Sequence, residues 1–114
     1  MLALLCTACA KHGGFLEHAV GGTVAVARSD GRCDERGGVS EGTRVTIAGP
    51  EGNVLGTTHL GAARSDDARQ RCVYLFGFTG IPSSDRYWLS VAGRTSSYTQ
   101  AELQLKNWFV NLTG

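Results

Sequence analysis

Apolar and polar residues alternate along several short segments of this 114-residue chain, and this period of two constrains the fold more than any other feature. The pattern is clearest from Arg71 to Ile81, where Cys72 and three aromatic side chains fall on one face. Shorter segments of the same kind lie at 23–27, 43–47, 54–60, 86–92 and 108–112. Successive side chains of a strand point to opposite faces, so each segment is predicted to be a strand with one buried face.

One segment near the C-terminus departs from the strand pattern. Thr99 is followed three residues later by Glu102, which fits a capping box, and good helix formers continue to Lys106. Gly- and Pro-containing turns, such as that at 49–53, separate the apolar segments. About six to seven strands with one short helical turn near the C-terminus predict an all-β fold, namely an immunoglobulin-like or transthyretin-like sandwich.

The N-terminal segment has a different composition from the rest of the chain. Residues 1–10 are apolar and too short to span a bilayer, which needs about 20 residues. We interpret them as a signal-peptide remnant or lipoprotein leader, and residues 11–114 as a single β-sandwich domain. Thr7-Ala8-Cys9 resembles a lipobox, which makes Cys9 a lipidation candidate, while the alternative is ordinary cleavage before Lys11. An unprocessed N-terminus without a role is the third interpretation.

The four cysteines are divided between the leader and the body. Cys33 and Cys72 are the two body cysteines, and an exported protein is expected to keep them oxidised, so we predict a disulfide between them. The alternative is two unrelated buried thiols. Cys6 and Cys9, with His12 and His18, are residue types that zinc accepts, but an apolar leader is a poor place for a structural site.

The inventory of chemical groups argues against catalysis and against nucleic acid. The chain has 11 Lys and Arg against 10 Asp and Glu, so no charge excess attracts nucleic acid or lipid headgroups. Its three histidines include His59 at the end of a strand, and no nucleophile elbow, phosphate loop or zinc-protease motif is present. Four acids of the 29–42 loop lack the spacing of a calcium loop: Asp30, Asp34, Glu35 and Glu41. We therefore expect no enzyme and no cofactor.

Two segments, 29–42 and 61–70, are the longest predicted loops, and a Cys33–Cys72 bridge would bring them together. They and their flanks carry a rim of mixed charge: Arg28, Asp30, Arg32, Asp34, Glu35, Arg36, Arg64, Asp66, Asp67 and Arg69. Such a rim suits a salt-sensitive protein contact more than a deep ligand pocket. Trp88 and Phe109 fall on the faces opposite the apolar residues of their strands, and are the second candidate for binding.

The body also resembles an uncharacterised family of small actinobacterial secreted proteins and lipoproteins with a disulfide-linked β-sandwich domain. The resemblance covers about residues 20–114. It is carried by Gly22-Thr23-Val24, Cys33, Gly42-Thr43-Arg44-Val45-Thr46-Ile47, Gly52-x-Val54-Leu55-Gly56, Leu60-Gly61, Cys72-x-Tyr74-x-Phe76-x-Phe78-x-x-Ile81-Pro82, Tyr87 and Tyr98-Thr99-x-Ala101-Glu102-Leu103. Gly38-Val39-Ser40-Glu41 stands where the family usually has an acidic stretch. The family has no assigned activity, so the resemblance implies fold and location.

Together these observations predict a non-enzymatic extracytoplasmic protein, secreted or lipid-anchored to the outer face of the cytoplasmic membrane. We expect a monomer that serves as a binding or structural module for a protein or a cell-wall component, with membrane contact only through a lipid anchor. The alternative is a soluble secreted effector or inhibitor, such as a phage-derived superinfection-exclusion lipoprotein.

Overall fold

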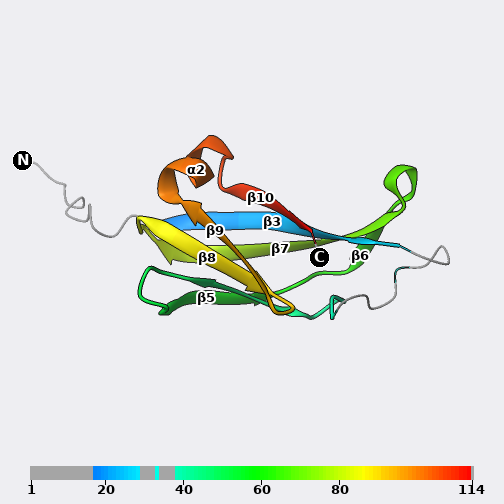
Figure 1. Cartoon of the computed structure of the whole chain (residues 1–114), viewed down its shortest axis with the longest axis horizontal. Helices are drawn as coiled ribbons and strands as arrows, with labels where there is room; N and C mark the ends of the chain where they lie inside the picture. The colour runs from blue at the N-terminus through cyan, green and yellow to red at the C-terminus, as the bar shows by residue number, and fades with distance from the viewer. Residues whose placement is uncertain (1–16, 29–32, 34–37, 114) are drawn as a thin grey trace, which may run out of the picture.

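The computed structural model describes residues 17–28, 33 and 38–113 of the chain, and Figure 1 shows the arrangement of its elements. Its elements in chain order are β3 (Glu17–Ala27), β4 (Arg44–Ala48), β5 (Val54–His59), β6 (Ala63–Asp66), the short 3-10 helix η1 (Asp67–Arg69), β7 (Arg71–Pro82), β8 (Arg86–Val91), β9 (Arg94–Thr99), α2 (Gln100–Leu105) and β10 (Phe109–Thr113).

The strands form two sheets of four strands each, which confirms the predicted all-β architecture. One sheet has the order β10-β3-β7-β6 and is called here the β3–β7 sheet, while the other has the order β5-β4-β8-β9 and is called the β4–β8 sheet. Neighbouring strands are antiparallel, except that β10 runs parallel to β3, with Phe109 opposite Gly21. Figure 1 shows the two sheets as layers, with α2 at one end between β9 and β10.

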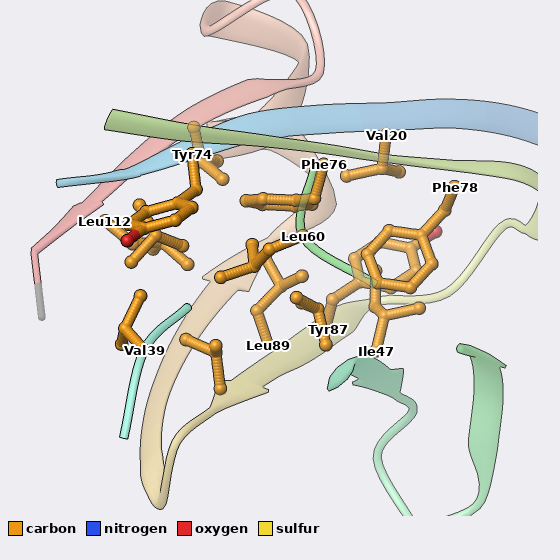
Figure 2. Packing of buried hydrophobic residues seen from close by; sticks show 14 of the residues in the cluster. Val20, Val39, Ile47, Leu60, Tyr74, Phe76, Phe78, Tyr87, Leu89 and Leu112 are labelled. Atoms are coloured by element: carbon orange, nitrogen blue, oxygen red, sulfur yellow. The ribbon is translucent and has the colours of Figure 1, made fainter. Parts of the chain in front are cut away.

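The core lies between the two sheets and is built mainly from alternate residues of β3, β4, β7, β8 and β10. Tyr74, Phe76 and Phe78 point inward from β7, and Figure 2 shows them above Ile47 and Leu89 of the opposite sheet. All five side chains are buried. Within the described residues the buried set contains no polar or charged side chain, so burial of apolar surface is the main contribution to stability here.

The predicted helical turn is present as α2. Its N-cap, Thr99, accepts a hydrogen bond from the backbone nitrogen of Glu102 at 3.1 Å, and the Glu102 carboxylate accepts one from the Thr99 backbone at 2.7 Å. This is a capping box, as the sequence predicted. The backbone hydrogen bond from Thr99 is the main reason that the pKa of Glu102 lies below its ordinary value. Leu103 is buried beneath the helix, which carries the chain from one sheet to the other.

Two strands were not predicted, and two predicted strands start elsewhere: β3 begins at Glu17 rather than Thr23, and β10 begins at Phe109. The 61–70 loop contains β6 and η1, and the hydroxyl-rich segment from Arg94 to Thr99 forms the edge strand β9. Both strands lie at sheet edges, where the apolar alternation of a central strand is not required. Trp108 does not begin the last strand: its φ of 59° places it in the turn after α2, where its backbone nitrogen donates to Leu103 at 2.7 Å.

Candidate functional site

Cys33 and Cys72 form a disulfide, with their Cα atoms 5.6 Å apart, and this confirms the predicted pair. Cys72 lies on the inner face of β7 and is fully buried, while Cys33 packs against the edge of the core. The bridge therefore fixes one point of the 29–42 loop to the β3–β7 sheet. A structural disulfide of this kind indicates an oxidising, extracytoplasmic environment.

Charged residues gather at the end of the sandwich beside the bridge. The guanidinium of Arg28, just after β3, donates hydrogen bonds to the Ser65 hydroxyl and to the Asp67 carboxylate. The side chain of Arg28 is only 9% exposed, whereas that of Asp67 is 83% exposed. The Ser65 hydroxyl also donates to Asp67 at 3.0 Å. The three residues form a small network that links β3 to β6 and η1.

A second pairing lies next to this network, on the outer side of β6 and β7. Asp66 contacts Arg69 at 3.4 Å and Arg71 at 3.5 Å. The hydrogen bond from Arg28 is the main reason that the pKa of Asp67 lies below its ordinary value. Partial desolvation raises the pKa of Asp66, but hydrogen bonds from Arg69 and Arg71 outweigh it, so the net pKa is lowered. Asp66 and Asp67 are thus both engaged with arginines of the same chain, which leaves them less available to a partner.

The lowered pKa of Asp67 predicts a loss of stability in acid. A carboxyl whose folded pKa lies below its unfolded value stabilises the fold above the unfolded pKa, and the contribution disappears as pH falls through the folded value. We expect Asp67→Asn to lower the free energy of unfolding at neutral pH, and the difference from wild type to shrink below about pH 4. Urea unfolding across the acid range is the measurement.

Asp85 provides the control for this prediction, because its side chain makes no ion pair with the part of the chain that the structure describes. Asp85→Asn should leave the free energy of unfolding at neutral pH close to that of wild type, as exposed surface substitutions usually do. If the difference in free energy of unfolding between Asp67→Asn and wild type is the same at every pH, the Arg28–Asp67 pair contributes nothing to acid sensitivity.

The two candidate aromatics lie on opposite outer faces of the sandwich. Trp88 projects from the outer face of the β4–β8 sheet and is half-buried, while Phe109 is 44% exposed on the outer face of the β3–β7 sheet. They cannot contribute to one binding surface. A hollow of about 270 Å³ lies beside Trp88, lined by Ala48, Gly49, Pro50, Gly52 and Trp88 itself. Its lining is mostly apolar.

Several predicted positions lie outside the described residues: Cys9, Asp30, Arg32, Asp34, Glu35 and Arg36, and with them Cys6 and His12 of the zinc interpretation. Arg64 is exposed on β6. His18 contacts the Ser83 hydroxyl at 3.0 Å and stacks on the Trp108 ring, with ring centroids 3.9 Å apart. Within the described parts of the chain, no three of His, Cys, Asp and Glu gather as metal ligands would.

A row of hydroxyl side chains was not singled out from the sequence. Thr57, Thr46, Ser90 and Thr95 lie opposite one another across the four strands of the β4–β8 sheet, on its outer face. In the sequence Thr46, Thr57 and Ser90 are simply polar positions of alternating patterns, and Thr95 lies in a hydroxyl-rich segment. Only the strand register shows that the four residues form one line.

These features define a class of structure, a disulfide-linked sandwich of two four-stranded sheets. The chain gives no significant match to protein-family models, to curated proteins or to solved structures. Among the described residues, no helix has the length and apolar character that crossing a membrane requires.

Proposed function

We propose that this protein is a non-enzymatic, extracytoplasmic binding module, exported through its N-terminal segment and either secreted or lipid-anchored at Cys9. The observation that carries the proposal is the Cys33–Cys72 disulfide, which ties a long loop to the core of a small sandwich. Exported domains with limited cores commonly use such bridges, and the oxidised pair is stable outside the cytoplasm. The resemblance of residues 20–114 to actinobacterial secreted proteins and lipoproteins agrees with this location.

We also propose that the sandwich is an immunoglobulin-like Greek key. If β3 is taken as strand B, the sheet orders correspond to A-B-E-D and C′-C-F-G, with β10 in the position of strand A. Tyr87 supports the assignment, because it lies at the start of β8 and its hydroxyl donates to the Pro82 carbonyl at 2.8 Å. A tyrosine at the start of strand F that bonds a few residues upstream is a tyrosine corner. There are two departures: β10 is parallel to β3, and it is the last strand of the chain, whereas strand A comes first.

Binding rather than catalysis fits the way the side chains are placed. The described charged residues near the bridge pair with one another, as the largely buried Arg28 does with the exposed Asp67, and Arg69 with Asp66. A sandwich with an apolar interior presents its loops and outer sheet faces for recognition. The outer face around Trp88 and the loop end beside Cys33 are therefore the two surfaces that a protein or wall component would contact.

Expression with the native leader in an actinobacterial host tests this proposal. We expect the chain outside the cytoplasm, with Cys33 and Cys72 oxidised and an N-terminus at a lipidated Cys9 or at Lys11, as intact mass would show. The purified protein should sediment with isolated cell envelopes and release neither reducing sugars nor peptides from them. A cytoplasmic chain that retains Met1, or a preparation that degrades the envelope, would contradict the proposal.

A further inference from the structure

The outer face of the β4–β8 sheet combines hydroxyl groups with a tryptophan in a way that the core does not require. Thr57, Thr46, Ser90 and Thr95 form one row across β5, β4, β8 and β9. Strands are spaced about 4.8 Å apart, so the row is about 14 Å long. Ser90 and Thr95 bond each other at 2.9 Å, whereas the Thr46 and Thr57 hydroxyls have no hydrogen-bond partner within the described residues.

The next row places an aromatic ring beside these hydroxyls. Ala48 lies opposite Trp88, and Trp88 opposite Ser97, on the same outer face. The hollow of about 270 Å³ lies against the Trp88 ring, with Pro50 and two glycines of the β4–β5 turn on its other side. Among the described residues nothing accepts a hydrogen bond from the Trp88 indole nitrogen, so its N–H is available to a ligand. We call the surface made by Thr46, Thr57, Trp88, Ser90 and Thr95 the hydroxyl–tryptophan face.

Two arginines lie on the strands of this face, and carboxylates stand only at its ends, with Glu51 in the β4–β5 turn and Glu102 of α2 close enough to Arg86 for their charges to interact. Arg44 and Arg86 project from the outward positions of β4 and β8, and Arg86 reaches the Ser97 hydroxyl at 3.4 Å. The outward positions of the four strands carry no carboxylate: Arg44, Thr46 and Ala48 on β4, Val54, Thr57 and His59 on β5, Arg86, Trp88 and Ser90 on β8, and Thr95, Ser97 and Thr99 on β9. A ligand that bears carboxylates would meet no like charge on these strands.

We infer that the hydroxyl–tryptophan face binds a linear glycan and favours one that bears carboxylates. This inference rests on the proposed binding function and names the class of ligand for it. The apolar face of a pyranose ring can stack on Trp88, while the ring's hydroxyls exchange hydrogen bonds with Thr46 and Thr57, since each hydroxyl both donates and accepts. The row is long enough to follow more than one sugar ring along a flat chain.

The same features argue against a peptide as the occupant. Grooves for proline-rich peptides are lined by several aromatic side chains, and protein-binding patches have an apolar centre surrounded by a polar rim. On this face a single aromatic ring adjoins Ser and Thr side chains, which is the reverse arrangement. Its hydroxyl groups form one row across the sheet, which suits an extended polysaccharide chain.

Isothermal titration calorimetry of the oxidised protein provides the test. Three probes are compared. The first is the neutral glycan chitohexaose, the second is peptide-free glycan strands that carry lactyl carboxylates, and the third is a proline-rich peptide. We expect both glycans to bind, the acidic strands more tightly. Trp88→Ala should weaken glycan binding about tenfold or more. The double variant Thr46→Val, Ser90→Ala should weaken glycan binding several-fold.

Phe109→Ala is the matched control, because it removes an exposed ring from the opposite outer face and should leave glycan affinity unchanged. Urea unfolding of Trp88→Ala verifies that the variant is folded, and Trp88→Phe, which keeps an aromatic ring, should restore part of the affinity. Binding of the peptide but not the glycans, or equal affinities of Trp88→Ala and wild type, would overturn the inference. Envelope sedimentation without any glycan binding would leave the proposed function intact and remove only this ligand class.

Discussion

Reduction of the Cys33–Cys72 disulfide is expected to lower the free energy of unfolding by about 4 kcal/mol, because the bridge closes a long loop in the unfolded chain. The two cysteines are 39 residues apart in sequence. Single domains are commonly stable by about 5–15 kcal/mol, so this loss would leave a marginal fold. Urea denaturation with and without dithiothreitol measures the difference without any change of side chain.

The leader cysteines must be removed from this comparison, because dithiothreitol would also reduce any disulfide that they form with each other or with another chain. A chain with Cys6→Ser and Cys9→Ser should behave like wild type in both conditions. A second variant, Cys33→Ala with Cys72→Ala, should match the reduced protein and show no response to dithiothreitol. An unfolding midpoint that does not move on reduction would mean that the bridge does not constrain the fold.

Gly22→Ala is expected to destabilise the protein by about 3 kcal/mol or more, because overpacking at this position meets backbone as well as side chains. A Cβ on Gly22 would lie 2.4 Å from the Val110 carbonyl oxygen and 2.7 Å from the Phe76 ring. Neither neighbour can move easily: Val110 is held in β10, which pairs with β3, and Phe76 is in the core. Thermal and urea unfolding measure the effect.

Gly77→Ala is the matched control for this prediction. Gly77 lies on β7, next to β3 in the same sheet, and a Cβ there would meet no atom within 4 Å. It should change stability by less than about 0.5 kcal/mol, as surface substitutions usually do. If Gly22→Ala is tolerated as well as Gly77→Ala, β10 does not lie against β3 as described.

The fold was predictable where burial imposes a repeating pattern. β3, β4, β7, β8 and β10 each bury alternate residues, so their apolar periodicity marked them in the sequence. The capping box marked α2 because it is a local interaction between Thr99 and Glu102. β9 and β6 lack this signal, since an edge strand rich in Ser, Thr or charged residues has the composition of a loop.

The candidate site was only partly predictable, because its geometry depends on long-range register. The disulfide followed from cysteine count and compartment, and the pairing of β6 with β7 sets Asp66 opposite Arg71, next to Cys72. That Asp66 and Asp67 pair with arginines of the same chain could not be deduced, since the pairs need β6 and η1 beside β3. The same holds for the hydroxyl row, whose members are up to about 50 residues apart in sequence and meet only through strand pairing.

Recognition at the hydroxyl–tryptophan face is tested most directly by the two indole N–H signals of the ¹⁵N-labelled protein during titration with peptide-free glycan strands. Trp88 lies on the face, and Trp108, stacked on His18 at the end of the sandwich, is an internal reference. We predict that the Trp88 indole signal shifts progressively and saturates, together with the amides of Thr46 and Ser90, while the Trp108 signal stays in place. A saturating shift of the Trp108 signal alone, or of amides around Asp67 with Trp88 unmoved, would contradict this assignment of the binding surface.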